Sequence, residues 1–219
     1  MKLKQGSRLL FTGDSVTDVG RNRPVAQGTL FDPLGKGYPH IVSGLINAVY
    51  PGWGIHVINS GNSGDTSRRL AARWQTDVLD FKPDWVSVMI GINDVWRQFD
   101  SPCQPEEQVG PEEYEETLDG LFRRTRPLLA GGLVVMLPFY LELHLDDAMR
   151  GRLVRYQEIC RELAARYDAL LVDTQGAFDR LLAERNANFV SWDRVHPNNV
   201  GHSLLAREFL RAVDFDFYR

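Results

Sequence analysis

The sequence predicts an α/β protein: a three-layer α/β/α sandwich built on a five-stranded, mainly parallel sheet. Five short apolar runs, rich in Val, Ile and Leu, are spaced along the chain, and amphipathic helical patterns lie between them. Strands that alternate with helices predict a parallel sheet that is covered on both faces. The length of 219 residues suits one domain, 1–219, and a hydrophobic fraction of 43% is ordinary for a globular protein.

The predicted strands are nearly continuous apolar runs, which are typical of strands buried on both faces. In chain order they are Arg8 to Phe11, His56 to Asn59, Trp85 to Ile90, Leu133 to Phe139 and Ala169 to Val172.

The predicted helices have apolar residues three and four positions apart, which places these residues on one face. The patterns run from Tyr38 to Val49, Leu70 to Phe81, Tyr114 to Leu128 and Met149 to Tyr167, and a last helix follows Asn198 with Val200, Leu204, Leu205, Phe209 and Leu210 facing inward. Asn198 is a good N-cap residue. Two polar stretches, 18–37 and 97–110, are left as long loops, and such loops in a compact domain are often functional.

The bulk composition excludes some functions. A net charge of −4 argues against general nucleic-acid binding, which needs a basic surface. No segment has the apolar length that a membrane span requires, and the N-terminus lacks the pattern of a signal peptide. Cys103 and Cys160 have no motif spacing, so we expect free thiols and a cytoplasmic location.

Small polar residues follow three of the predicted strands. In open α/β sheets, sites lie beyond the carboxyl ends of the strands. The first strand is followed by Gly13-Asp14-Ser15, the second runs into residues 59–65 (NSGNSGD), and the third is followed by residues 91–94 (GIND). Turns favour Gly, Asn, Asp and Ser anyway, so each segment alone is weak evidence of a site.

The segment SWDRVHPNN, residues 191–199, contains Asp193 three residues before His196. In a tight turn this spacing can bring the carboxylate to Nδ1 of the imidazole, so that the other ring nitrogen faces an incoming serine hydroxyl. Histidine suits proton transfer because its unperturbed pKa of about 6.5 is near neutrality. Alone, such a pair is more often two surface turn residues. Combined with Ser15 and the strand-end donors, it indicates a hydrolase.

These four segments together resemble the SGNH hydrolases, a branch of the GDSL esterases and lipases, and the resemblance covers nearly the whole chain. It implies that Ser15 is the nucleophile, that His196 is the general base and then the general acid, and that Asp193 orients His196. It also implies an oxyanion hole formed by the backbone N–H groups of Ser15 and Gly64 and the side-chain amide of Asn93. We expect Asp14 and Asp94 to hold these loops through backbone hydrogen bonds.

Longer segments, such as GDSVTDVGRNRP and WDRVHPNNVGH, look like the bacterial intracellular acetylxylan esterases of this family. The resemblance implies removal of acetyl groups from xylo-oligosaccharides. Aromatic rings suit sugar binding, and Trp192, Trp96 and Tyr140 are the candidates for the pocket wall, although each could instead belong to the core. We expect a homo-oligomer, because the loop 18–37 would otherwise expose Leu30, Phe31 and Leu34.

Two alternatives remain open. The same residues would serve a short-chain carboxylesterase, a lysophospholipase or a thioesterase. A non-catalytic module that binds carbohydrate or nucleotide on a flavodoxin-like sheet is the other class, but no glycine-rich nucleotide motif lies between a strand and a helix. We expect no cofactor and no metal, since His196 and His202 are six residues apart without a supporting carboxylate cluster.

Overall fold

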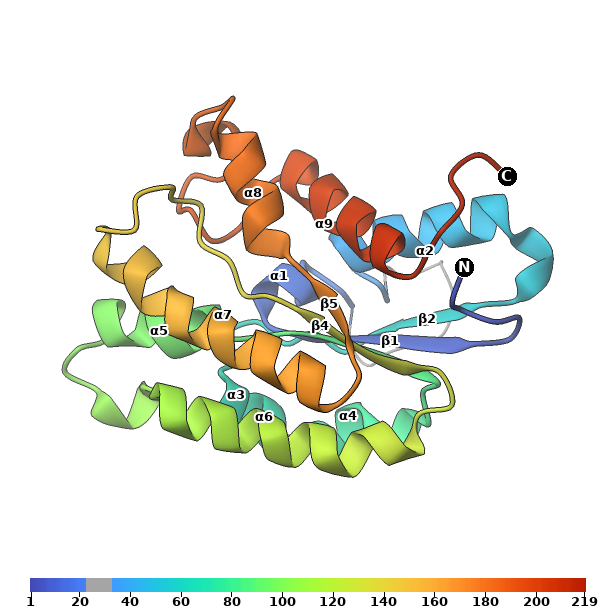
Figure 1. The fold of residues 1–219 in the computed structure, drawn as a ribbon, viewed down its shortest axis with the longest axis horizontal. Coiled ribbons are helices and arrows are strands. Elements are labelled where there is room, and N and C mark those ends of the chain that lie inside the picture. The colour runs from blue at the N-terminus through green and yellow to red at the C-terminus, as the bar shows by residue number, and fades with distance from the viewer. Residues whose placement is uncertain (23–32) are drawn as a thin grey trace.

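The computed structural model describes residues 1–22 and 33–219, and one five-stranded sheet lies at its centre (Figure 1). The strands are β1 (Arg8–Gly13), β2 (His56–Asn59), β3 (Trp85–Met89), β4 (Gly132–Met136) and β5 (Leu170–Val172). Their order is β2-β1-β3-β4-β5, and every pairing is parallel. This order is that of flavodoxin-like doubly wound folds, so the predicted fold class is confirmed.

Helices cover both faces of the sheet (Figure 1). The described helices are α1 (Ser15–Asp18), α2 (Tyr38–Val49), α3 (Ser67–Ala72), α4 (Trp74–Asp77), α5 (Ile92–Asp100), α6 (Pro111–Thr125), α7 (Ala148–Arg166), α8 (Thr174–Leu182) and α9 (Asn199–Ala212). Helices α2, α8 and α9 pack on one face, and α3 to α7 pack on the other.

Successive strand residues point to opposite faces and so build two hydrophobic clusters. In β1, Leu10 belongs to the cluster under α3 to α7, whereas Leu9 and Phe11 belong to the cluster under α2, α8 and α9. Because β1 is paired on both edges and covered on both faces, its side chains from Leu9 to Thr12 are fully buried, as its apolar run predicted.

Four details of the sequence prediction are corrected. The helix predicted from Leu70 to Phe81 is broken: α3 ends at Ala72, α4 runs from Trp74 to Asp77, and a short 3₁₀ turn follows. The interruption lies at Arg73, whose backbone (φ −105°, ψ 6°) is outside the α-helical region.

The other corrections concern exposure and loop boundaries. Val200 is 41% exposed rather than inward, because it lies in the first turn of α9, whereas Leu205 and Phe209 are buried. The fourth strand ends at Met136, three residues before Phe139. Residues 97–100, predicted as loop, are the last turn of α5. Within the predicted 18–37 loop, Leu30 and Phe31 lie outside the described residues, and Leu34 packs partly buried against the α2/α9 cluster.

The carboxyl ends of β1 and β3 lie side by side at the place where the strand order reverses. Doubly wound proteins place their sites there, because the connections on the two sides of this point diverge. Within residues 1–22 and 33–219, no helix has the length and apolarity to cross a membrane.

Candidate active site

Ser15 is the first residue of α1, directly beyond β1. Gly13 ends the strand at φ +155°, and a Cβ there would lie 2.1 Å from the backbone oxygen of Met89. Only glycine therefore lets β1 pass this close to β3 and turn immediately into the helix. Asp14 caps α1 by accepting a hydrogen bond from the Val16 N–H at 3.0 Å. The turn presents Ser15 at the edge of the sheet.

Ser15, His196 and Asp193 form a continuous chain of hydrogen bonds, as the sequence predicted. Ser15 Oγ lies 2.8 Å from His196 Nε2, and His196 Nδ1 lies 2.5 Å from Asp193 Oδ2. A carboxylate only accepts, so Nδ1 carries the proton and Nε2 is the acceptor that faces the serine hydroxyl. This is the geometry by which a histidine takes the proton of an attacking serine.

The other oxygen of Asp193 accepts three more hydrogen bonds. They come from the His196 N–H at 2.8 Å, the Val195 N–H at 3.0 Å and the Ser191 hydroxyl at 2.8 Å. Partial burial raises the pKa of Asp193, but these bonds and the one from the imidazole outweigh burial and lower it to about 2. The carboxylate of Asp193 is therefore ionised throughout the neutral pH range.

The turn between Asp193 and His196 is held tightly against its surroundings. Arg194 adopts a left-handed conformation with φ +63°, and its carbonyl accepts the Leu141 N–H at 2.9 Å. Its guanidinium pairs with Glu142 at 2.8 Å. The segment after β4 thus fixes the position of the turn that carries the histidine.

The three predicted oxyanion donors lie on three different segments at this edge. Ser15 begins α1, Gly64 lies in the turn between β2 and α3 at φ +83°, and Asn93 is a buried residue of α5. One N–H of the Asn93 amide donates to the Asp65 carbonyl at 2.9 Å, which leaves the second N–H for a ligand. Among the hydrogen bonds of the described residues, none uses the Gly64 N–H.

Asp14 and Asp94 have the bracing positions that the sequence suggested. Burial, together with the negative charges of Asp94 and Asp65, raises the pKa of Asp14 to about 7, although the Val16 N–H lowers it in part. Burial raises the pKa of Asp94 to about 6, against hydrogen bonds from the hydroxyl and backbone of Ser67 at 2.5 and 3.0 Å. Asp94, a residue of α5, thereby holds Ser67, the first residue of α3, against α5.

The three candidate aromatic side chains lie in different environments. The ring of Trp96 is tilted against that of His196 with 5.9 Å between their centroids, and it also packs partly buried on the α3 to α7 cluster. Trp192 is 86% exposed. Tyr140 is partly buried, and Gln175 holds its backbone by bonds of 2.9 and 3.0 Å. Of the three, only Trp96 has a described ring contact with the triad.

Sequence reasoning missed Ser191 and Arg73. Ser191 stands two residues before Asp193, and this spacing is the only sequence signal for its hydrogen bond to the carboxylate. Arg73 contacts the ends of β1 and β2, and its place within a predicted helix gave no signal of this role. Within the described part of the chain, no group of three or more His, Cys, Asp or Glu residues is placed to hold a metal ion.

Comparison with known families and sequences shows what this chain is similar to. Residues 11–204 match the model of the GDSL-like lipase/acylhydrolase family. The chain is 49% identical to an acetylxylan esterase of Geobacillus stearothermophilus over 100% of this chain and 99% of that protein.

Solved structures show the same similarity. A catalytic mutant of Axe2, an acetylxylan esterase from the same organism, superposes with a TM-score of 0.97 at 48% identity, covering 100% of this chain and 99% of that one. Catalytic mutants of Axe2 replace a serine, an aspartate or a histidine by alanine. LAE5, an alpha/beta hydrolase enzyme from the metagenome of Lake Arreo in Spain, has a TM-score of 0.95 at 46% identity, with 98% of both chains covered. The chain belongs to the GDSL-like lipase/acylhydrolase family.

Proposed function

We propose that this protein is a serine esterase that removes acetyl groups from xylo-oligosaccharides or related acetylated sugars through an acyl-enzyme on Ser15. The observation that carries the proposal is the hydrogen-bonded chain from Ser15 through His196 to Asp193. A nucleophile, a base within reach of it and a group that orients the base are the parts that acyl transfer needs.

The first half-reaction makes the acyl-enzyme. Ser15 Oγ attacks the acetyl carbonyl carbon while its proton moves to His196 Nε2, and the carbonyl oxygen becomes an oxyanion. When this tetrahedral intermediate collapses, the bond to the sugar oxygen breaks and His196 returns the proton to that oxygen. The deacetylated sugar leaves, and acetyl-Ser15 remains. Asp193 stabilises the imidazolium that exists between these two proton transfers.

The second half-reaction releases acetate. A water molecule gives a proton to His196 as its oxygen attacks the acetyl carbonyl carbon. Collapse of the second tetrahedral intermediate breaks the bond to Ser15 Oγ, which recovers its proton from His196. In both halves the oxyanion would be held by the N–H groups of Ser15 and Gly64 and the free N–H of the Asn93 amide. These donors are neutral and fixed before reaction, which is the arrangement that stabilises developing charge best.

Two findings support an acetylated sugar as the substrate. Relatives described as acetylxylan esterases match over the whole chain. In this chain, Trp192 exposes 86% of its surface directly before Asp193, and a half-buried Trp96 packs beside His196. Exposed aromatic faces next to polar groups suit sugars, and Tyr140, beside the Arg194 turn, would extend the same wall.

The direct test is acetate release from acetylated xylo-oligosaccharides, measured beside other acetylated sugars and a series of aryl esters from acetyl to octanoyl. We expect the acetyl esters to be preferred and Ser15→Ala to abolish release while the circular dichroism spectrum stays that of the parent. A preference for octanoyl esters would instead favour a general carboxylesterase, a lysophospholipase or a thioesterase. Full activity of Ser15→Ala would refute the mechanism.

We infer further that residues 1–219 act as one domain, in the cytoplasm and as a homo-oligomer. Both hydrophobic clusters share the single sheet. Cys103 and Cys160 are free thiols, which suits a reducing compartment. Leu145 and Phe189, 60% and 50% exposed, are large apolar side chains of the kind that interfaces cover. Cell fractionation tests the location, and light scattering during size-exclusion chromatography tests the assembly.

A further inference from the structure

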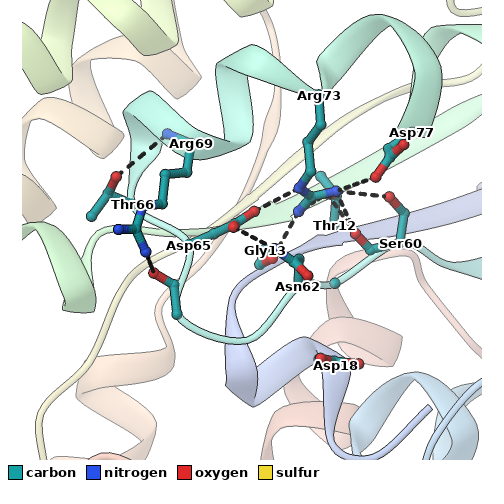
Figure 2. Close-up of polar contacts among 12 residues, drawn as sticks. Thr12, Gly13, Asp18, Ser60, Asn62, Asp65, Thr66, Arg69, Arg73 and Asp77 are labelled. Atoms are coloured by element: carbon teal, nitrogen blue, oxygen red, sulfur yellow. Dashed lines mark hydrogen bonds and ion pairs between the residues drawn. The ribbon is translucent and has the colours of Figure 1, made fainter. Parts of the chain in front are cut away.

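Arg73 lies at the break between α3 and α4 and turns its guanidinium inward to the catalytic edge of the sheet (Figure 2). Its side chain is 15% exposed. A charged group at this depth needs partners in several directions, because arginine has five N–H donors in a fixed plane. The surroundings of Arg73 supply them.

The guanidinium donates to the ends of two neighbouring strands. One terminal nitrogen donates to the Gly13 carbonyl at 3.1 Å, two residues before the proposed nucleophile. The other donates to the Ser60 carbonyl at 2.7 Å, directly after β2. Weaker contacts reach the Thr12 hydroxyl at 3.5 Å and the Asp77 carboxylate at 3.3 Å. One side chain thus ties the exit of β1 to the exit of β2.

The third direction of the guanidinium leads into the turn that contains Gly64. Nε donates to Asp65 Oδ2 at 2.6 Å (Figure 2), and Asp65 is itself buried. The other oxygen of that carboxylate accepts the side-chain amide of Asn62 at 2.6 Å, and the Asn62 N–H donates to the Gly13 carbonyl at 2.9 Å. The turn 61–65 is therefore joined to the end of β1 twice, directly through the Asn62 N–H and indirectly through Arg73.

The network extends to the third donor of the proposed oxyanion hole. The carbonyl of Asp65 accepts the Asn93 amide at 2.9 Å, so the orientation of that amide depends on where Asp65 lies. The segments that carry Ser15, Gly64 and Asn93 are consecutive in space but remote in sequence. Arg73 contacts the first two directly and reaches the third through Asp65.

We propose that Arg73 is a positioning residue that sets the spacing of the three oxyanion-hole donors. The proposal rests on the function proposed above. Its physical basis is that donors stabilise a transition state only when their positions are fixed, and that a displacement of about 1 Å can cost on the order of 100-fold in rate. Lysine cannot replace arginine here, because one ammonium cannot donate in three directions within a plane.

The test compares Arg73→Lys and Arg73→Gln with matched changes at Arg68. Arg68 lies on α3, the helix that precedes Arg73; its side chain is 45% exposed and pairs with Glu113 away from the strand ends. Active enzyme is counted by labelling Ser15 with a fluorophosphonate, so that misfolded protein does not enter kcat. We expect kcat for an aryl acetate to fall about 10- to 100-fold in the Arg73 variants while KM changes less than about threefold. The Arg68 variants keep the parent kcat.

A second readout separates positioning from a merely structural role. Methylboronic acid forms a tetrahedral adduct with the serine and places an oxygen where the oxyanion lies. We expect its inhibition constant to rise by about the factor by which kcat falls, because both depend on the same donors. The midpoint of the acidic limb of the kcat/KM profile stays where it is in the parent, because Arg73 does not contact the histidine.

Chemical rescue tests the same role in a variant that lacks the whole guanidinium side chain. Arg73→Ala should regain part of its kcat with methylguanidinium chloride and none with methylammonium chloride at equal ionic strength. If Arg73→Ala does not fold, Arg73→Lys decides the matter alone. A parent-like kcat and boronate affinity per labelled site, with only a lower melting temperature, would overturn the positioning role. Full activity of Ser15→Ala would instead overturn the function on which it rests.

Discussion

Asp193 combines two roles at the scale of a single residue, because one oxygen faces the imidazole and the other accepts three N–H or O–H groups. The second oxygen organises the turn, and the first fixes the tautomer of His196. Since the pKa of Asp193 is lowered to about 2, the carboxylate stays charged throughout the neutral range. Its removal should therefore affect geometry and electrostatics together.

For Asp193→Asn we expect kcat to fall on the order of 10⁴-fold, because an amide N–H facing Nδ1 selects the wrong tautomer of the histidine. The measurement is kcat for an aryl acetate at neutral pH, with circular dichroism to confirm the fold. Ser191→Ala is the graded comparison, since it removes one of the four hydrogen bonds and leaves the charge. A loss in Asp193→Asn no larger than that in Ser191→Ala would argue against tautomer control.

Asn93→Ala tests the proposed oxyanion hole at its side-chain donor. We expect kcat to fall about 10²- to 10³-fold with little change in KM, since the donor acts on charge that develops only in the transition state. Asn47→Ala is a suitable control, because Asn47 is exposed on α2 and its side-chain amide donates to Ser43 in the same helix. An unchanged kcat in Asn93→Ala would remove this residue from the proposed hole.

The sequence alone predicted those site residues that have reactive side chains and also lie at the end of a predicted strand or the start of a predicted helix. Ser15, Asp193 and His196 stood out because their segments occur together at the ends of predicted elements, and their roles followed from the resemblance of those segments to the SGNH hydrolases. Arg73 and Asp65 were not, because a guanidinium within a helical pattern and an acid in a turn predict only solvated groups. Their inward orientation depends on a helix break that the apolar spacing of Leu70, Trp74 and Val78 does not reveal.

At the scale of elements, the strands were predicted closely and the helices less so. Strand patterns reflect burial on both faces, which β3 and β4 have in full, whereas Leu171 of the edge strand β5 is 39% exposed. Helical periodicity reports which residues are buried and is insensitive to a break that keeps them buried: Leu70, Trp74 and Val78 all lie in one cluster on either side of Arg73. Helix α8, nine residues with polar Gln175 and Gly176 near its start, is too short to give a clear period.

The exit of β1 should be the least tolerant element boundary. In Gly13→Ala, the added Cβ would meet the Met89 carbonyl at 2.1 Å with φ at +155°, so the two strands must separate. We expect a loss of about 1 to 3 kcal/mol in the free energy of unfolding, measured by denaturant titration, together with a lower kcat. Gly44 is an exposed residue of α2, and a Cβ added there meets nothing within 4 Å. Gly44→Ala should therefore raise the free energy of unfolding by about 0.5 to 1 kcal/mol. Equal effects would contradict this reading.

At the scale of the whole molecule, the buried carboxyl groups of Asp14 and Asp94 beneath the site make the free energy of unfolding depend on pH. The pKa of Asp14 is raised to about 7, above the value of about 3.9 for an unfolded aspartate. Below pH 4 the residue is protonated in both states. As the pH rises to 7 the unfolded chain loses its proton first, so the folded state loses stability over this window. Asp94, with a pKa of about 6, acts in the same direction.

We expect the melting temperature of Asp14→Asn, relative to that of the parent, to rise between pH 4 and pH 8, because the variant has no proton to lose. Scanning calorimetry at several pH values measures this difference. Asp193, whose pKa is lowered to about 2, destabilises the fold only as the pH falls below 4, so it does not enter this window. A difference that does not vary with pH would mean that Asp14 is ionised in the folded protein above pH 4.

The strand order itself was implicit in the sequence only in part. Alternating elements predicted a parallel sheet covered on both faces, and the carboxyl ends of its strands predicted where the polar turns would lie. The pairing of β1 with both β2 and β3 came from the structure, and this pairing brings residues 13, 60 and 89 to one edge. Long-range proximity of this kind depends on topology, which the local patterns of the sequence do not contain.

The exposure of Trp192 gives the protein a built-in optical probe. Trp74 and Trp85 are buried, whereas Trp192 is almost entirely open to solvent beside the catalytic turn. Its emission should lie at longer wavelength than that of the buried indoles, and acrylamide should quench it first. If a sugar covers this ring, the quenching constant falls as ligand is added, and the fall disappears in Trp192→Phe. Binding of a non-hydrolysable sugar to the site can then be followed by tryptophan fluorescence alone.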